Sequence, residues 1–486
     1  MIMSTILKKL QPEKVWEYFE EICNIPRPSK KEEKIISYLL EFGKKFNLET
    51  KKDDVGNVLI KKPATKGNEK KKTVILQSHV DMVCEKNSDV QHNFETDAIA
   101  PYIDGGWLKA KGTTLGADNG IGVAASLAVL ASNDIEHGNI ECLFTVDEET
   151  GLTGAFNLKP DFLKGNILLN LDSEDEDQIF IGCAGGKQTS IKMNYNKESF
   201  PQNYIAFKIS VTGLQGGHSG GDIHLGRGNS IKILNRLLWN LSNLYKIRIL
   251  NIEGGNLHNA IPREAFATIA VSENEKNKLI EYITSYNKII KEEFSVTDNK
   301  VEISCISCNN PFQVIDLKTQ NNLLNSLYAC PNGVIAMSAD IPGLVETSTN
   351  LATVKTFENE IEIVASQRSS VESSKQDIAD MVEATFRLTN AKIEQGDGYP
   401  GWKPNTKSEI LNITKTSFVK VLKYEPKILA IHAGLECGVI GEKYPGMDMI
   451  SFGPTMRDVH SPDEKLEIKS VNNFWLLLLE VLKNIP

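Results

Sequence analysis

The sequence has few cysteines and no long apolar run. Its eight cysteines are scattered over 486 residues, and only Cys305 and Cys308 form a CxxC pair. Without a second pair this spacing excludes a zinc ribbon, and scattered thiols are typical of reduced cytoplasmic proteins. No stretch reaches the roughly 20 apolar residues of a membrane helix, and residues 1–14 lack the apolar core of a signal peptide. We therefore expect a cytoplasmic protein without a membrane segment.

A net positive charge is also absent. The formal net charge of −9 and the pI near 5.6 argue against nucleic acid as the main partner. The one basic block, KKPATKGNEKKK at 61–72, lies between two strand-like runs, which predicts a solvated hairpin loop and not a binding patch. With 41% hydrophobic and 24% charged residues the chain is able to bury a large core, and its length suits two or three domains.

Strand and helix patterns alternate in the first and last parts of the chain. The expected helices lie within 13–46 and at 119–132 and 469–484, and the expected strands lie at 55–62, 73–79, 140–146, 166–171, 427–432 and 449–453. This alternation predicts an α/β layer fold with a mixed, largely buried sheet flanked by helices.

The middle of the chain predicts an inserted α+β domain. A unit of strands and helices extends over about 204–310, and a similar unit recurs over about 313–398 with the same two-strand rhythm. We expect two ferredoxin-like repeats. The expected borders are 184–398 for the insertion, with the α/β domain divided into 1–183 and 399–486.

Ionisable side chains lie at the carboxyl ends of the predicted α/β strands. The segment TVILQSHVDMVCE (73–85) ends its strand at His79, and Asp81 points to the same side because strand residues alternate. Comparable positions in the α/β part are Asp118, Asp147, Glu148, Glu149, Asp172 and His460. The ligand crevice of an open α/β sheet lies beyond the carboxyl ends of its strands. We therefore expect these side chains to converge.

Converging carboxylates and imidazoles suit divalent metal ions. Carboxylates that repel one another tolerate close approach best beside a cation, and His with Asp or Glu suits zinc, manganese or cobalt. Five ligands exceed one tetrahedral ion but fit two ions that share a carboxylate, and two metals about 3.5–4 Å apart are a known hydrolytic device. Each residue alone is more simply interpreted as a turn, a cap or a hydrogen-bonded side chain. The set predicts a dinuclear site.

The order of six motifs resembles that of the dinuclear zinc exopeptidases, a family that includes aminoacylase, carboxypeptidase G and carnosinase. The motifs are SHVDMV (78–83), GTTLGADNGIGVA (112–124), FTVDEETGLTGA (144–155), LNLDSED (169–175), GGHSGGDIH (216–224) and GPTMRDVHSPDE (453–464). The resemblance spans almost the whole chain and implies a catalytic domain with the insertion as a lid. It also implies two ligand sets that share Asp118: the first adds His79 and Asp172, and the second adds Glu149 and His460.

The resemblance further implies catalytic and substrate-binding residues. Asp81 orients His79 by accepting the proton of its other ring nitrogen. Glu148 is the general base that takes a proton from a metal-bridging water and passes it to the leaving amine. His218 is a lid residue that stabilises the oxygen of the tetrahedral intermediate. Asn259 and Arg368 come from different lid repeats and hold the substrate carboxylate.

The implied activity is hydrolysis of unblocked dipeptides, typically Xaa-His and including β-alanyl-histidine, with two divalent ions. Zinc is the first expectation, and cobalt or manganese remain open. Alternatives on the same site are an N-acyl amino acid amidohydrolase or a broader di/tripeptidase. A non-catalytic binding protein of this fold is a further alternative, although it has no need of the base Glu148. The doubled lid predicts a site completed within one chain, and a homodimer remains open.

Two glycine motifs point to other functions. The segment GHSGG (217–221) is a literal G-x-S-x-G, but no helix pattern follows Ser219 at once, which disfavours a serine nucleophile and leaves a structural turn open. The segment GIGVAA (120–125) matches the dinucleotide pattern G-x-G-x-x-A, but it lacks a preceding strand, and Asp118 would repel a pyrophosphate. The remaining candidates have no assigned role: His432, Glu436 and Ser461 near the site by sequence, and His92, His137, His224 and His258 as ordinary polar residues.

Overall fold

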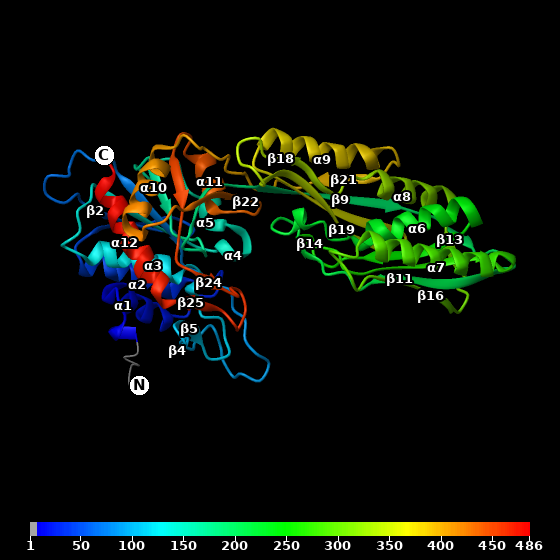
Figure 1. The fold of residues 1–486 in the computed structure, drawn as a ribbon, viewed down its shortest axis with the longest axis horizontal. Helices are drawn as coiled ribbons and strands as arrows, with labels where there is room; N and C mark the ends of the chain where they lie inside the picture. The colour runs from blue at the N-terminus through cyan, green and yellow to red at the C-terminus, as the bar shows by residue number, and fades with distance from the viewer. Residues whose placement is uncertain (1–6) are drawn as a thin grey trace. The chain divides into compact units, whose positions relative to one another are not determined.

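The computed structural model describes residues 7–486, which form two compact units. Unit 1 comprises the chain up to Gly182 together with Trp402–Ala430 and Leu435–Pro486, and unit 2 comprises Cys183–Gly401 with Ile431–Gly434. The α/β class expected from the sequence is confirmed (Figure 1). The functions assigned to the two parts, catalytic domain and lid, stay predictions. Within the described residues, no helix has both the length and the apolar character needed to span a membrane.

Unit 1 is built on an eight-stranded sheet in the order β1-β2-β6-β3-β7-β23-β8-β22. The strands are β1 (Glu49–Lys52), β2 (Val58–Lys62), β3 (Val74–His79), β6 (Ile140–Thr145), β7 (Ile167–Asn170), β8 (Gln178–Cys183), β22 (Lys427–Ile431) and β23 (Asp448–Ser451). The central strands β6, β3, β7 and β23 run parallel, and the first three of them are buried over their full length. Their carboxyl ends therefore lie at one edge of the sheet.

The expected hairpin at the basic block 61–72 is wrong. Strands β2 and β3 do not pair, because β6 lies between them, antiparallel to β2 and parallel to β3. The segment therefore crosses over β6. Its lysines pair with residues of unit 1, such as Lys72 with Glu409.

Helices of unit 1 pack on its sheet and on one another. They are α1 (Glu13–Cys23), α2 (Glu33–Lys45), α3 (Ala117–Ala131), α4 (Glu148–Gly151), α5 (Thr153–Phe156), α10 (Glu409–Leu422), α11 (Glu436–Lys443) and α12 (Ile468–Asn484). Helix α3 packs on β3 and α1, and its small residues permit the close approach. A Cβ at Gly122 would lie 2.8 Å from the carbonyl oxygen of Leu171, so a side chain there would push the helix off the sheet.

A second, four-stranded sheet in unit 1 was not predicted from the sequence. It has the order β24-β25-β5-β4, with β4 (Pro101–Asp104), β5 (Trp107–Ala110), β24 (Met456–Arg457) and β25 (Lys465–Glu467). The connection between β24 and β25 carries His460.

Unit 2 is built on a nine-stranded antiparallel sheet. Its main path is β16-β11-β15-β13-β19-β20-β9-β21, and β18 pairs with β19. The strands are β9 (Gly185–Asn194), β11 (Tyr204–Thr212), β13 (Arg248–Gly254), β15 (Ala265–Ser272), β16 (Glu302–Cys308), β18 (Gly333–Met337), β19 (Val345–Thr356), β20 (Glu360–Ser369) and β21 (Lys392–Gln395). The helices are α6 (Ser230–Tyr245), α7 (Lys276–Glu293), α8 (Leu317–Ala329) and α9 (Glu372–Arg387).

The order of the strands corrects the expected second repeat at 313–398. When the strands of each half are numbered by their order along the chain, the first half, β16-β11-β15-β13, has the spatial order 4-1-3-2. The other half, β19-β20-β9-β21, has the same order in reverse. The second half takes its first strand from β9, which precedes the whole first repeat. One repeat is therefore inserted within the other, and the two do not follow in tandem.

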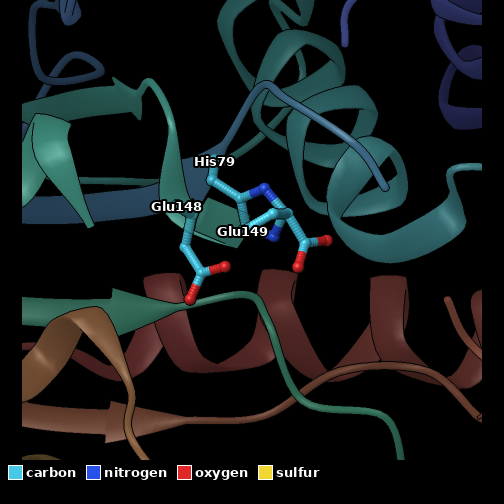
Figure 2. A group of neighbouring side chains, drawn as sticks. All are labelled: His79, Glu148 and Glu149. Atoms are coloured by element: carbon cyan, nitrogen blue, oxygen red, sulfur yellow. The ribbon is translucent and has the colours of Figure 1, made fainter. Parts of the chain in front are cut away.

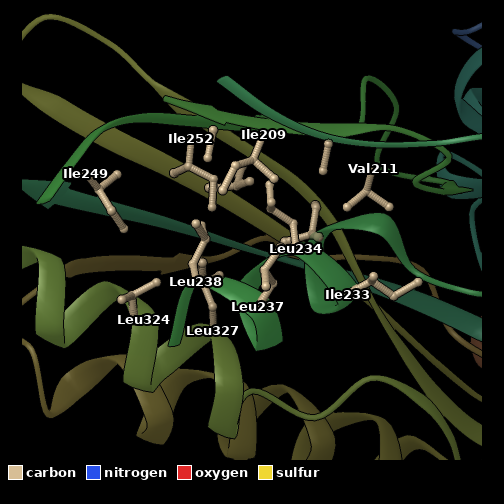
Figure 3. Close-up of a cluster of buried hydrophobic side chains, with 14 of the residues drawn as sticks. Ile209, Val211, Ile233, Leu234, Leu237, Leu238, Ile249, Ile252, Leu324 and Leu327 are labelled. Atoms are coloured by element: carbon tan, nitrogen blue, oxygen red, sulfur yellow. The ribbon is translucent and has the colours of Figure 1, made fainter. Parts of the chain in front are cut away.

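A single apolar core lies between the sheet of unit 2 and its helices. Helix α6 presents Ile233, Leu234, Leu237, Leu238 and Leu241 at the three-to-four-residue spacing of one helix face, and all are buried. Figure 3 shows four of these side chains beside those of strands β11 and β13. Full burial of each aliphatic side chain contributes roughly 1.5–3 kcal/mol. The side chain of Asn229 starts the helix by accepting hydrogen bonds from the backbone N–H groups of Ile231 and Lys232.

Candidate metal centre

The five predicted ligands lie at the carboxyl edge of the unit 1 sheet. His79 ends β3, Asp118 lies in the first turn of α3, Glu149 lies in α4 after β6, Asp172 follows β7, and His460 follows β23. They form two groups, His79 with Asp118 and Asp172, and Asp118 with Glu149 and His460, and the donor atoms of each group lie within 4.8 Å of one another. Asp118 belongs to both groups.

Asp118 turns one carboxylate oxygen to each group. Its Oδ1 lies 3.1 Å from His79 Nε2, and its Oδ2 lies 3.1 Å from His460 Nε2. The Asp118–Asn119 peptide bond is cis. A carboxylate that faces two histidines with separate oxygens is suited to bridge two cations.

The other two carboxylates complete the groups. Asp172 Oδ1 lies 3.4 Å from His79 Nε2, and Glu149 Oε2 lies 3.1 Å from His460 Nε2. Two buried oxygens are incompletely satisfied: Glu149 Oε1 has no hydrogen-bond partner, and Asp172 Oδ1 has the long 3.4 Å contact with His79 Nε2. Buried polar atoms are ordinarily paired, so oxygens in this state beside two imidazoles fit a site for cations.

The pKa values of these side chains also indicate a site for cations. Burial raises the pKa of Asp172 well above its usual value, and the Asp118 carboxylate adds to the increase. Hydrogen bonds with Asp118 and Glu149 raise the pKa of His460 to about 11. The carboxylates of both groups therefore favour positive charge beside the imidazoles. His and carboxylate ligands suit zinc, cobalt and manganese.

Asp81 is the buried carboxylate that joins β3 to α4. Its side chain is fully buried and accepts hydrogen bonds from Ser29 Oγ at 2.8 Å, from the Glu148 N–H at 3.0 Å and from the Glu149 N–H at 3.2 Å. Its Oδ1 also lies 3.3 Å from His79 Nδ1. Burial would raise the pKa of Asp81, but the His79 imidazole and the backbone donors lower it to about 2. The carboxylate therefore stays ionised and fixes both the imidazole and the start of α4.

Glu148 and Glu149 are adjacent in sequence but point in different directions. Strand β6 ends before Asp147, whose positive φ of 50° turns the chain into α4, where neighbouring side chains are about 100° apart around the helix axis. Figure 2 shows the two carboxylates diverging near the His79 ring. Burial raises the pKa of Glu148 well above its usual value, and nearby carboxylates add to the increase. A carboxyl group with a raised pKa is suited to accept and hold a proton.

Of the three functional residues predicted in the lid, the catalytic residue His218 and the substrate-binding residue Arg368 lie together in unit 2. Arg368 of β20 is buried, its Nη2 lies 3.4 Å from His218 Nε2, and its Nη1 donates a hydrogen bond to Tyr399 Oη at 2.8 Å. Burial and the guanidinium lower the pKa of His218, so its imidazole is neutral. The backbone carbonyl of Asn259 accepts a hydrogen bond from the N–H of Ser219, the residue after His218. The side chain of Asn259 is exposed.

Residues without an assigned role fall into distinct environments. Burial and Arg368 lower the pKa of His432 to about 3, and its Nε2 lies 2.7 Å from Ser348 Oγ. Glu436 is fully buried and accepts hydrogen bonds from Gln77 at 2.5 Å and Thr145 at 2.7 Å. Burial raises the pKa of Glu436 to about 7. Ser461 donates to the carbonyl of Asp458 within its own turn.

The glycine motifs are explained by packing. A Cβ at Gly120 would lie 2.7 Å from Arg27 Nη2, so this position in α3 needs glycine for close packing. After the G-x-S-x-G segment the next α-helix, α6, begins only at Ser230. Neither motif has the strand–turn–helix context of its alternative function.

Sequence reasoning missed two buried charged residues beside the site, Arg27 and Glu464. Both bind backbone atoms of the ligand-bearing loops. The only sequence signals were an arginine between two prolines and a glutamate in the same motif as His460.

Comparisons with known proteins identify the family of the chain. A model of peptidase family M20/M25/M40 matches residues 75–484. Over 480 residues the chain is 43% identical to the cytosol non-specific dipeptidase of Escherichia coli (strain K12), covering 99% of each chain. It is also similar to the crystal structure of aminoacylhistidine dipeptidase from Vibrio alginolyticus, with a TM-score of 0.93, 44% identity, and coverage of 99% of this chain and 98% of that one. The aminopeptidase PepT from Bacillus cereus, at 16% identity and a TM-score of 0.58, shares the fold over 98% of this chain and 99% of its own.

Proposed function

The chain belongs to peptidase family M20/M25/M40, and we propose that it is a cytoplasmic dinuclear metallodipeptidase acting on unblocked dipeptides. It is a hydrolase of peptide bonds, and the two relatives that are 43% and 44% identical to it over nearly their whole length are named as dipeptidases. The observation that carries the proposal is the pair of ligand groups that share Asp118, with Glu148 beside them.

The metal ligands follow from the two groups. His79, Asp118 and Asp172 would hold one ion, and Asp118, Glu149 and His460 would hold the other. Zinc suits this donor set best, and cobalt and manganese also fit. When bound, the two ions supply Lewis-acid chemistry by polarising the peptide carbonyl and making water more acidic.

The protein's own groups position the reactants and move protons. Glu148 takes the proton of the attacking water and gives it to the leaving amine, a role for which its raised pKa suits it. Asp81 keeps the His79 ring in one orientation. In unit 2, the neutral imidazole of His218 stabilises the negative charge that develops on the carbonyl oxygen. Arg368 and Asn259 bind the substrate carboxylate.

The substrate class is that of free dipeptides, with Xaa-His as the typical member. The motif resemblance and the name of the Vibrio relative support histidine at the C-terminal position, whereas the Escherichia relative is named as non-specific. We therefore expect Xaa-His dipeptides, including β-alanyl-histidine, to be cleaved together with other dipeptides.

Histidine release from an Xaa-His dipeptide tests the proposal. Metal-stripped protein is assayed before and after zinc is added back, with an N-acetylated dipeptide as the blocked control. We expect activity to return with about two metal equivalents. We also expect it to be absent in Glu148→Ala and retained in Glu442→Ala, an exposed glutamate of α11. Cleavage of the blocked substrate alone would point to an N-acyl amidohydrolase. Activity that is indifferent to metal would refute the proposal.

A mixing experiment tests whether one chain holds a complete site. We expect a mixture of His218→Ala and Glu148→Ala proteins to stay inactive, because unit 2 carries both lid repeats. Recovered activity would show that the site is shared between chains of an oligomer.

A further inference from the structure

The Glu464 carboxylate is surrounded by backbone N–H groups of the loop that leads into α3. Its Oε2 accepts the N–H groups of Leu115 at 2.7 Å and Gly116 at 3.0 Å, and its Oε1 accepts that of Ala117 at 2.8 Å. The N–H of Asp118 points to the same Oε1 at a longer 3.4 Å. The side chain is 2% exposed. An anion bound by successive N–H groups at a helix start is electrostatically favoured.

Arg27 holds the same loop from the carbonyl side. Its Nη2 donates to the carbonyl of Gly116 at 2.5 Å, and its Nη1 donates to the carbonyls of Val80 at 2.9 Å and Asp81 at 2.8 Å. Arg27 is 3% exposed. The planar fork of arginine therefore ties the end of β3, with His79 and Asp81, to the loop that carries Asp118.

Gly116 lies between the two charged groups. Its φ is +69°, and a Cβ there would lie 2.5 Å from Arg27 Nη2 and 2.9 Å from Met82 Sδ. Its N–H binds Glu464, and its carbonyl binds Arg27. Only glycine permits Arg27 to approach the backbone this closely while Glu464 binds the same peptide segment through its N–H group.

We propose that Arg27 and Glu464 are positioning residues that fix the three ligand-bearing loops relative to one another and thereby set metal affinity. Glu464 joins the loop of His460 to that of Asp118, and Arg27 joins the loop of Asp118 to that of His79. The loops that each residue joins carry one histidine and Asp118, which face each other in one of the two ligand groups. The inference rests on the proposed dinuclear site and adds that the spacing of its ligands depends on these two buried charges.

Unit 1 offers a matched control for the loss of a buried carboxylate. Glu141 is also 2% exposed, and its Oε2 accepts the N–H groups of Lys164 at 2.8 Å and Gly165 at 2.9 Å. It lies in β6 near the start of the strand, at the edge of the sheet opposite to the ligands. A general loss of stability will therefore occur in Glu141→Gln as well, whereas a loss of ligand spacing will not.

The experiment measures metal binding without substrate. Metal-free wild type, Glu464→Gln, Arg27→Lys and Glu141→Gln are titrated with zinc by calorimetry at a temperature at which circular dichroism shows each of them folded. We expect Glu464→Gln and Arg27→Lys to bind zinc about 10- to 100-fold more weakly. In Glu464→Gln the loss falls mainly on one of the two equivalents. Glu141→Gln keeps wild-type affinity.

Each outcome decides the inference. Wild-type affinity in both variants, or an equal loss in Glu141→Gln, overturns it. If Glu464→Gln does not fold, Arg27→Lys carries the test, because lysine keeps the charge and lacks the three-way fork. The readout is metal affinity, so a wild type that binds two zinc ions but cleaves no dipeptide would refute the proposed function and leave this inference standing.

Discussion

Replacement of Asp81 by asparagine separates the role of this carboxylate in metal binding from its role in stability. The asparagine keeps the volume of the side chain but has one acceptor oxygen in place of two. In the wild type, separate oxygens accept the N–H groups of Glu148 and Glu149. One of these donors therefore loses its partner and faces an amide N–H₂ group.

The magnitude follows from the pKa of the group. Hydrogen bonds lower the pKa of Asp81 from 3.8 to about 2 despite its burial, and each unit of pKa corresponds to about 1.4 kcal/mol. The ionised form therefore stabilises the fold by about 2 kcal/mol, and a buried unpaired donor costs about 1–3 kcal/mol. Because the folded-state pKa is lowered, this contribution is complete above about pH 4 and is lost as the pH falls through about 2. At neutral pH we expect Asp81→Asn to lose about 2–4 kcal/mol of unfolding free energy.

Urea unfolding of the metal-free protein and zinc titration provide the assay. Asp53 gives a control, because its Oδ1 accepts the backbone N–H groups of Val55, Gly56 and Asn57 in a turn of unit 1. Its Oδ2 accepts a hydrogen bond from Asn57 Nδ2, which the N–H₂ group of an asparagine there is unable to accept. We expect Asp53→Asn to lose stability with unchanged zinc affinity, and Asp81→Asn to lose stability and also about 10- to 100-fold in zinc affinity. Wild-type zinc affinity in Asp81→Asn would refute the reasoning that this carboxylate holds the His79 ring.

Three further predictions concern single residues. Glu148→Gln is expected to lower kcat by about 10²- to 10⁴-fold while elemental analysis still finds the wild-type metal content; loss of metal would contradict its role as a base. Burial and Arg368 lower the pKa of His432 to about 3, so the unfolded chain binds more protons below about pH 6.5, and stability falls by about 1 kcal/mol between about pH 7.5 and about pH 5.5. His432→Gln is expected to reduce this pH dependence in thermal unfolding, and an unchanged dependence would assign it elsewhere. A Cβ at Gly220 would lie 2.1 Å from the carbonyl oxygen of His432, whereas at Gly221 the nearest atom is His218 Nδ1 at 3.7 Å. Gly220→Ala is therefore expected to lower the stability of the folded protein by about 1–3 kcal/mol, with Gly221→Ala near wild type in the same unfolding assay.

Local patterns in the sequence were sufficient for many elements and for the convergence of the candidate ligands. Strand β3, the small-residue helix α3 and the closing helix α12 lie within two residues of their predicted bounds. Each is recognisable by its composition: β3 is a short apolar run with β-branched residues, α3 is rich in small residues, and α12 contains the apolar run FWLLLL. The convergence of His79, Asp118, Glu149, Asp172 and His460 followed from one rule, that parallel strands bring their carboxyl ends to one edge. Their division into two ligand groups followed from the family resemblance. The structure places these five side chains in the two expected groups.

Tertiary structure decided what depends on pairing between distant segments. The basic block 61–72 looked like a hairpin, but β6, about 70 residues further along the chain, lies between its flanking strands. The repeat of unit 2 took its first strand from β9, ahead of the other repeat, because a strand's neighbour is set by the sheet and not by chain order.

The supports of the site were hidden for the same physical reason. Arg27 and Glu464 bind backbone carbonyl and N–H groups of loops far from them in sequence, and every residue type other than proline offers those same groups. No pattern of side chains identifies such a partner in advance. The sequence by itself therefore determined which side chains are able to hold the metal ions, and only the folded backbone decided which buried charges keep them in place.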